Sequence, residues 1–433
     1  MSLDTSRPAG TAAPAASRAP EVVIVGGGVI GVCCAYYLAG RGASVSVLER
    51  NEIARGASFG NAGAFTPGHV PINKPGRVSQ AIRSLGRPTS ALYLAPRLDP
   101  ALAWWLLDFA RHCTAAHLEA SMGILGPLGH AAGKLLDEIM SEERLQCSYQ
   151  RGGRYDVFLT ERALSAGSAE AALVRRYGFE AEILGAAEMR EREPALSDDV
   201  VGGVYDPGAS VADPYRFVVE LAERARRHGA RVRIGCVVGG VRLRGGRVEG
   251  VQLAGGEVVV ADSVILAAGA HTAALTGPLG LRLPLQGAKG YHRDRDLKDG
   301  ATPPLRTACL LGEYGVFCTP LDGYVRFAGT LEFSGLNERM RRPRLEQLTN
   351  AARKYFKGMG DAAPTSEWCG LRPCLPDGLP VVGPVPQMPG LFLATGHAMM
   401  GLTLGPVTGR LMADLVLDGK AGMDLHMLRA DRF

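Results

Sequence analysis

The sequence predicts an α/β fold in which a Rossmann-type dinucleotide-binding domain is interleaved with an α+β domain. The chain has 433 residues, more than one hydrophobic core usually organises. Residues 22–49 read as a buried strand, a glycine-rich turn, a helix and a second strand, and a further apolar strand at 264–268 runs into Gly269. The mainly helical pattern of 76–204 lies between them. The first domain is therefore interrupted and later resumed.

The turn at 26–31 matches G-x-G-x-x-G in the context that the motif requires, after an apolar strand and at the start of a helix. Gly26 permits the tight turn, Gly28 lets the backbone approach a pyrophosphate, and Gly31 lets the helix pack on the sheet. Glu49 ends the second strand, where a carboxylate can bind an adenosine ribose. We therefore expect a dinucleotide to be held by Gly26, Gly27, Gly28, Val29, Ile30, Gly31, Glu49 and Arg50.

The predicted domain boundaries follow changes in the sequence pattern. Residues 1–20 are rich in Ala, Pro, Ser and Thr and are expected to form a disordered tail. A long loop of Gly, Asn and Pro follows Glu49, and Asp213 with Pro214 marks the start of a helix that runs to His228. The dinucleotide-binding domain is assigned to 21–75, 205–280 and 370–433, and the second domain to 76–204 and 281–369.

Composition excludes several classes of protein. The formal net charge is only +5, and the densest basic cluster, at 339–344, is more typical of a solvated helix start than of a nucleic-acid surface. Nine cysteines without a C-x-x-C motif predict neither a disulfide framework nor a metal site, which fits a reducing, cytoplasmic compartment. No apolar run is long enough to span a membrane. The segment 91–109, with Trp104 and Trp105, is expected to pack over the second domain; peripheral contact with the inner face of a membrane is the alternative.

Several blocks, in order, resemble the FAD-dependent D-amino acid oxidase superfamily and, within it, the bacterial D-amino acid dehydrogenases. The resemblance covers nearly everything after residue 20 and rests on VVIVGGGVIG at 22–31, GASFGNAG at 56–63, VADP at 211–214, VILAAGA at 264–270, KGYH at 289–292, RFAGTLEF at 326–333, WCGLRPCLPDGLPVVG at 368–383 and ATGHAMMGLTLGP at 394–406. It implies a D-amino acid oxidase-like fold of two domains, bound FAD, and oxidation of a carbon that bears an amine.

The resemblance also extends the expected cofactor site. The 56–63 loop offers backbone N–H groups and small side chains that can approach a flat ring or a phosphate. Its G-A-S-F-G stretch also matches a nucleophile elbow, but it lies in a loop rather than between a strand and a helix, which disfavours a serine hydrolase. The added residues are Ala57, Ser58, Asn61, Ala62, Gly63, Val238, Ala268, Gly269, Gly396, His397, Gly401, Leu402 and Thr403.

In some relatives a cysteine in the C-terminal block is linked to the flavin. That position falls here on Gly370, with Cys369 beside it and Cys374 further along. The resemblance therefore implies non-covalent FAD.

Two residues are expected to contact the substrate. Arg372, in GLRP, can hold a carboxylate with two parallel charge-assisted hydrogen bonds, and the resembling family places its carboxylate-binding arginine in this motif. Tyr291 is expected to donate a hydrogen bond to the same carboxylate and to cover the flavin. Arg326 and His69 are weaker candidates, and a structural role is expected for both.

The reaction implied is dehydrogenation of a D-amino acid, or of a cyclic D-imino acid such as D-proline or D-hydroxyproline, with electrons passed to a quinone or other acceptor. Two alternatives stay open. An oxygen-using glycine or sarcosine oxidase has the same fold, because oxygen reactivity depends on charge and access near the flavin. A non-catalytic flavin-binding electron-transfer subunit would not need the carboxylate-binding residues Arg372 and Tyr291.

Overall fold

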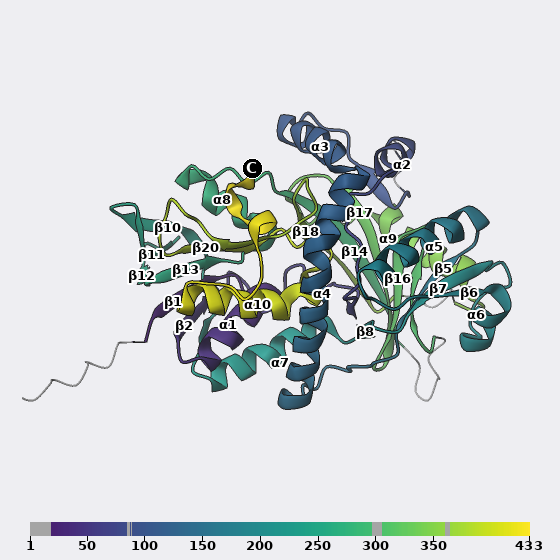
Figure 1. Ribbon diagram of the computed structural model, residues 1–433, viewed down its shortest axis with the longest axis horizontal. Coiled ribbons are helices and arrows are strands. Elements are labelled where there is room, and N and C mark those ends of the chain that lie inside the picture. Colours follow the sequence, from purple (N-terminus) through teal and green to yellow (C-terminus); the bar gives the residue numbers. More distant parts are fainter. Residues whose placement is uncertain (1–18, 85–86, 88, 297–304, 360–363) are drawn as a thin grey trace, which may run out of the picture.

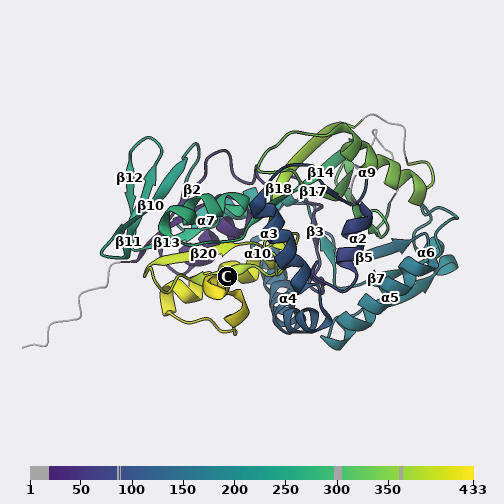
Figure 2. The same ribbon diagram turned by 90° about the horizontal axis from the view of Figure 1, so that it is seen from above.

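A computed structural model describes residues 19–84, 87, 89–296, 305–359 and 364–433. Except for residues 19 and 20, the predicted N-terminal tail lies outside this described part. Two large sheets occupy opposite halves of the elongated molecule, with helix α4 (Ala115–Glu143) running between them (Figures 1 and 2). The two-domain α/β fold that the sequence predicts is confirmed.

The smaller half contains the predicted Rossmann-type sheet. β1 lies between β13 and β2, and both neighbours are parallel to it. The six strands, in sheet order, are β19 (Val381–Pro384), β20 (Leu391–Thr395), β13 (Ser263–Leu266), β1 (Glu21–Val25), β2 (Ser44–Leu48) and β9 (Arg231–Arg233). A separate three-stranded sheet beside them contains β10 (Val238–Arg244), β11 (Arg247–Leu253) and β12 (Val258–Val260).

Three helices pack together in this half: α1 (Val29–Gly40), α7 (Pro214–Arg227) and α10 (Gly401–Asp418). The Asp213 side chain accepts hydrogen bonds from the backbone N–H groups of Tyr215 and Arg216, both at 3.0 Å, and so caps α7 as the sequence predicts. Two short helices follow β13, namely η1 (Gly269–His271) and α8 (Thr272–Thr276), and the strands β3 (Ala64–Phe65) and β8 (Ser210–Val211) pair beneath α10.

The larger sheet has nine strands. In order these are β18 (Ser366–Cys374), β14 (Gln286–Asp296), β17 (Tyr324–Phe333), β16 (Val316–Leu321), β15 (Ala308–Leu311), β5 (Arg154–Phe158), β7 (Gly202–Asp206) and β6 (Glu182–Gly185), with β4 (Leu92–Leu94) paired to β17. Helix α9 (Arg342–Tyr355) covers one face through Leu345 and Leu348, which share an apolar cluster with strand side chains. Helices α5 (Glu161–Arg176) and α6 (Ala186–Arg192) lie at the β6–β7 end.

The structure divides the chain differently from the predicted boundaries. Residues 205 and 370 fall inside β7 and β18, so these strands lie whole in the larger sheet. Leu125, Leu128 and Leu136 of α4 join the core formed by α1, α7 and α10, although the sequence assigns this segment to the second domain. The helix is long enough to leave the larger sheet and cover the smaller half.

Helices α2 (Arg77–Ser84) and α3 (Pro100–His112) neighbour one another at the upper edge of the molecule (Figure 1). Trp105 of α3 is buried and its indole N–H donates to the Cys374 carbonyl at the end of β18, 3.3 Å away. The 91–109 segment therefore packs over the larger sheet, as expected. Within the described residues, none of the helices combines the length and apolar character needed to cross a membrane.

Candidate active site

The predicted dinucleotide-binding residues gather at the carboxyl ends of the parallel strands. Gly26 follows β1, Glu49 follows β2 and Gly269 follows β13. The Gly27 N–H donates to the Glu49 carboxylate at 2.7 Å, and the Asn51 N–H donates to its other oxygen at 2.8 Å. Open α/β sheets bind ligands at this edge.

Helices α1 and α10 both begin at this edge, and neither is capped by the side chain of its own N-cap residue or carries an acid in its first turn. A Cβ added to Gly401 would lie 3.9 Å from a Val29 methyl group, so the two helix starts lie side by side. Free N–H groups and aligned dipoles at two adjacent helix N-termini favour an anionic ligand.

The remaining predicted cofactor residues surround this point. His397 is buried, donates or accepts one hydrogen bond with Thr408 at 2.9 Å, and has no partner for Nδ1 among the residues that the structure describes. Burial lowers the pKa of His397 to about 3, which keeps the imidazole neutral. Arg50 is exposed and lies 3.1 Å from His271, while Val238 begins β10 beside the segment that follows β9.

The 56–63 loop closes over the start of α1. Ser58 accepts a hydrogen bond from the Val29 N–H at 3.0 Å, and Asn61 accepts one from the Gly63 N–H at 2.9 Å. Arg326 of β17 donates to the Phe59 and Asn61 carbonyls, both at 3.1 Å, so the larger sheet fixes the position of this loop. The Arg326 guanidinium also makes two 2.8 Å contacts with Asp294, which leaves it a positioning residue, as expected.

Arg372 lies on the face of the larger sheet that also carries Arg326 and touches the 56–63 loop; we call this the site face. The Nη1 group of Arg372 donates to the Thr330 carbonyl at 2.8 Å. Within the described residues no carboxylate is paired with Arg372. Burial lowers the pKa of the Arg372 guanidinium, but arginine keeps its charge in proteins. A buried cation without an anionic partner is costly, so the arrangement favours an anionic ligand.

Two paired glycines make room for the side chains on the site face. Gly290 of β14 lies opposite Gly370 of β18. A Cβ on Gly290 would come within 2.0 Å of the Arg372 guanidinium, and one on Gly370 within 2.0 Å of the Trp368 ring. Arg372 and Trp368 therefore lie flat over the two missing side chains, on either side of the same glycine pair.

Thr330, whose carbonyl accepts the hydrogen bond from Arg372, has an unusual backbone conformation. Its φ is +62°, a left-handed value that a β-branched residue rarely adopts. The register between β14 and β17 shifts by one residue at this point, which marks a β-bulge. Backbone strain of this kind, about 1 to 3 kcal/mol, is concentrated at functional sites. In this protein the strained residue directs the Thr330 carbonyl toward the Arg372 guanidinium.

Tyr291 does not share the Arg372 site, which corrects the sequence-based expectation. It pairs with Cys369 across β14 and β18, whereas Arg372 pairs with Ala288, and successive strand residues point to opposite faces. Tyr291 is fully buried under α9, and its hydroxyl donates to Glu332 at 2.8 Å. The two residues lie on opposite faces of the sheet, so the phenol cannot bind the carboxylate that Arg372 holds.

Sequence reasoning missed two aromatic residues on the site face. Trp368 and His292 stack with ring centroids 5.5 Å apart, and Trp368 packs against Gly60 of the 56–63 loop. Burial lowers the pKa of His292 to about 4, with a smaller contribution from Arg326. The sequence did contain a pattern that could have identified Trp368. It lies four residues before Arg372 in one strand, with Gly370 between them, and such residues share a face.

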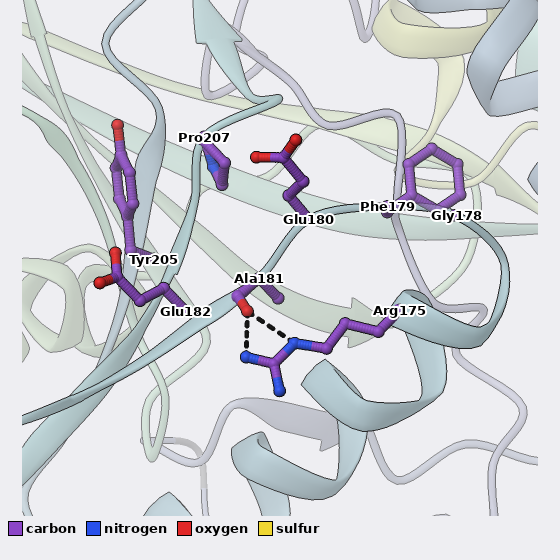
Figure 3. Close-up of a pocket in the computed structure, with 8 residues that line it drawn as sticks. All are labelled: Arg175, Gly178, Phe179, Glu180, Ala181, Glu182, Tyr205 and Pro207. Atoms are coloured by element: carbon purple, nitrogen blue, oxygen red, sulfur yellow. Dashed lines mark hydrogen bonds between the residues drawn. The ribbon is translucent and has the colours of Figure 1, made fainter.

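His69 and an open cavity lie outside this arrangement. Burial lowers the pKa of His69 to about 3, helped by the cations Arg154, Lys74 and Arg77, so it is a neutral side chain among charged ones. A cavity of 680 Å³ opens at the β6–β7 edge and is lined by Arg175, Phe179 and Glu182 among others (Figure 3). This edge is the far side of the sheet from β18, so the cavity is not part of the candidate site.

Comparison with known proteins decides the family. The family model for FAD dependent oxidoreductase matches residues 21–415. The chain belongs to this family of FAD-dependent oxidoreductases. It is 34% identical over 418 residues to a D-amino acid dehydrogenase of Xanthobacter autotrophicus, covering 95% of this chain and 99% of that one. A D-amino acid dehydrogenase of Methylobacterium nodulans is 35% identical over 401 residues, covering 92% and 95%.

A solved glycine oxidase from Geobacillus kaustophilus has the same fold, with a TM-score of 0.76 at 24% identity and coverage of 96% and 99%. This FAD-dependent oxidoreductase has residues that fit the cofactor. The starts of α1 and α10, which carry no acid, suit a pyrophosphate, and Glu49 suits a ribose. The Nδ1 of buried His397, which has no partner among the described residues, offers a hydrogen-bonding group.

We expect FAD to leave the protein when it is denatured by acid or heat. Cys369 points toward α9, away from the site face, and its thiol donates to the Glu338 carbonyl. Cys374 is buried beneath Trp105, and burial raises the pKa of its thiol to about 12, which disfavours the reactive thiolate. The measurement is flavin absorbance in the supernatant after precipitation. Yellow colour retained in the pellet, and lost in Cys374→Ser, would instead show covalent attachment.

Proposed function

We propose that this protein oxidises a D-amino acid, or a cyclic D-imino acid such as D-proline or D-hydroxyproline, and passes the electrons to a quinone. The observation that carries the proposal is the buried Arg372 guanidinium on the site face, which has no carboxylate partner in the part of the chain that the structure describes. The names of the relatives that are 34% and 35% identical support the D-amino acid. The 370–383 and 396–406 blocks resemble those of D-hydroxyproline dehydrogenases, which is the ground for including a cyclic substrate.

The chain's own residues bind and orient the substrate in this proposal. Arg372 holds the carboxylate through two parallel hydrogen bonds, while the Thr330 carbonyl fixes the guanidinium. Trp368 and His292 exclude water beside it, and His292 stays neutral because its pKa is lowered to about 4. FAD bound beside this site would supply the two-electron oxidant for the substrate carbon. The residues that bind the substrate need only hold its reacting carbon in place and keep solvent away.

The test is anaerobic mixing of the purified flavoprotein with a panel of D- and L-amino acids, D-proline and D-hydroxyproline. Bleaching of the oxidised flavin band reports reduction without an added acceptor. We expect bleaching by D-enantiomers and none by the matched L-enantiomers. Equal bleaching by both enantiomers would contradict the proposed D-substrate. Glycine and sarcosine are added to the panel, and bleaching by these two alone would replace the proposed substrate with that of the oxidase alternative.

We expect a quinone analogue or an artificial dye to be the preferred acceptor, with slow formation of hydrogen peroxide in air. This acceptor follows from the resemblance to dehydrogenases. The measurement compares initial rates of dye reduction and of oxygen consumption at the same substrate concentration. If oxygen were consumed as fast as the dye was reduced, the protein would be an oxidase.

A further inference from the structure

The site face continues beyond Arg372 across the larger sheet. Directly opposite residues on neighbouring strands project from the same face. One row of such residues crosses five strands: His292 on β14, Ala328 on β17, Phe317 on β16, Leu310 on β15 and Asp156 on β5. Asp156 therefore lies on the same face as Arg372, near the label of β5 in Figure 1.

A group of charged side chains surrounds Asp156 at the end of this row. We call it the distal group: Lys74, Arg154, Asp156, Glu170 and Asp206. Arg154 lies 3.0 Å from Asp156 and 3.9 Å from Asp206, and Lys74 pairs with Glu170 of α5. Two cations thus face three carboxylates, which leaves one negative charge. Arg77, a further cation near Lys74, turns toward exposed Gln80 of α2, to which it donates at 2.6 Å.

Asp156 is desolvated but can still be reached. Its side chain is 25% exposed, and Phe317 and Leu310 on the same row are half-buried. Burial raises the pKa of Asp156 to about 6, against the opposing effect of Arg154. One carboxylate oxygen accepts a long hydrogen bond of 3.3 Å from Arg154, and the other has no hydrogen-bond partner among the described residues. The carboxylate therefore retains capacity to accept hydrogen bonds from a ligand.

One segment connects the distal group to the cofactor residues. The Thr66 N–H donates to the hydroxyl of Thr403, at the start of α10, at 3.0 Å, and the His69 N–H donates to the Thr66 carbonyl at 3.1 Å. Lys74 follows five residues after His69. The Arg154 guanidinium also lies 5.7 Å from the centre of the Phe317 ring, over the middle of the row. The distal group is therefore continuous with the candidate active site along both the sheet and this segment.

The separation of Arg372 and Asp156 matches a long side chain. The Arg372 guanidinium contacts a carbonyl of β17, and Asp156 lies three strands further along the sheet, about 14 Å away. A carboxylate bound to a guanidinium, an extended chain of four methylene groups and an ammonium bound to a carboxylate also span about 14 Å. A cyclic imino acid held by Arg372 is too short to contact Asp156.

We propose that the distal group binds the cationic end of the substrate side chain, an ammonium or a guanidinium, while Arg372 holds the α-carboxylate. The proposal rests on the proposed function and narrows it to basic D-amino acids such as D-lysine or D-arginine. The cation compensates the one negative charge of the distal group, and Asp156 accepts its hydrogen bonds. Phe317 and Leu310 offer apolar surface to the methylene groups between the two ends.

The experiment measures kcat/KM of the flavin-loaded protein by dye reduction with D-lysine, with D-norleucine and with D-proline. D-Norleucine has the carbon chain of lysine without the ammonium. We expect wild-type kcat/KM to be at least about tenfold higher for D-lysine than for D-norleucine, because a hydrogen bond to a charged group is lost without the ammonium. Asp156→Asn should remove most of this preference.

Two further variants accompany Asp156→Asn, and the FAD content of each is measured. Leu310→Lys leaves the pair of Arg154 and Asp156 in place and puts an ammonium directly opposite Asp156, so it should also remove the preference for D-lysine. Glu182→Gln is the matched control. Glu182 lies opposite Tyr205, which lies opposite Tyr155, so its side chain projects from the other face of the sheet. Its preference should equal that of the wild type.

A preference for D-lysine that is lost in Asp156→Asn or Leu310→Lys and kept in Glu182→Gln would support the proposal. Wild-type oxidation of D-norleucine or D-proline as efficient as that of D-lysine would overturn it and leave the proposed function standing. A preference for D-lysine that persists in flavin-loaded Asp156→Asn and Leu310→Lys would also overturn it. If none of the three D-substrates reduced the flavin, the proposed function would fail together with the distal group.

Discussion

Arg372→Ala is expected to lower kcat/KM for the amino-acid substrate by about 2 to 5 kcal/mol, or roughly 30- to 5,000-fold, with FAD content unchanged. The substitution removes the buried cation that we propose holds the carboxylate, and the residues assigned to the cofactor lie on other elements. Arg372→Lys is expected to recover only part of this loss, because an ammonium cannot reproduce two parallel hydrogen bonds. Steady-state kinetics with a D-amino acid and its carboxamide provide the measurement.

Wild-type protein should discriminate strongly against the carboxamide, and Arg372→Ala should lose most of that discrimination. Arg293→Ala is a matched control, because Arg293 lies on the opposite face of β14 and pairs with Glu367 at 2.7 Å. Its discrimination should equal that of the wild type. Unchanged discrimination in Arg372→Ala would show that another residue holds the carboxylate. Arg326 is a poor substitute, because Asp294 already pairs with its guanidinium.

Gly28→Val is expected to give a folded protein that retains less than about a tenth of its FAD, because the side chain would fill the space that the pyrophosphate needs. The backbone itself accepts a side chain at this position. Gly28 has a φ of −77°, and an added Cβ would meet only the Ser58 hydroxyl, at 3.4 Å. Flavin absorbance per protein and the unfolding temperature are measured together.

Gly31→Ala is the matched comparison within the same motif. A Cβ at Gly31 would lie 1.9 Å from the Gly26 carbonyl oxygen, a clash that only a backbone shift can relieve. We expect destabilisation on the order of 3 kcal/mol, measured by denaturant unfolding of the protein stripped of flavin. A fully flavinated Gly28→Val protein would contradict the assignment of the motif to the pyrophosphate.

Local sequence was sufficient for the elements whose conformation depends on neighbouring residues. The spacing of Gly26, Gly28 and Gly31 predicted the first strand, turn and helix, and Asp213 before Pro214 predicted the start of α7. These patterns act through steric limits and hydrogen bonds within one or two turns of chain. The resemblance in the GLRP block predicted Arg372 as the carboxylate-binding residue, and this role stays a prediction.

Only the tertiary structure showed which side chains share a face of the larger sheet. Tyr291 and Arg372 lie about 80 residues apart in sequence, on neighbouring strands, and the pairing of Tyr291 with Cys369 decides that they point in opposite directions. A shift of one residue would have placed them together. The register is set by packing of the whole sheet against α9, which no local pattern encodes.

By itself, the sequence determined the Rossmann-type unit, the interleaved domains and the family to which the chain belongs. Only the tertiary structure decided that Asp294 neutralises Arg326 while Arg372 meets no carboxylate among the described residues. The same holds for the covering of the smaller half by α4, and for the exposure of Trp104 and burial of Trp105 on α3. The physical reason is the same in each case. Burial and pairing depend on which distant segments meet, and that depends on the packing of the complete chain.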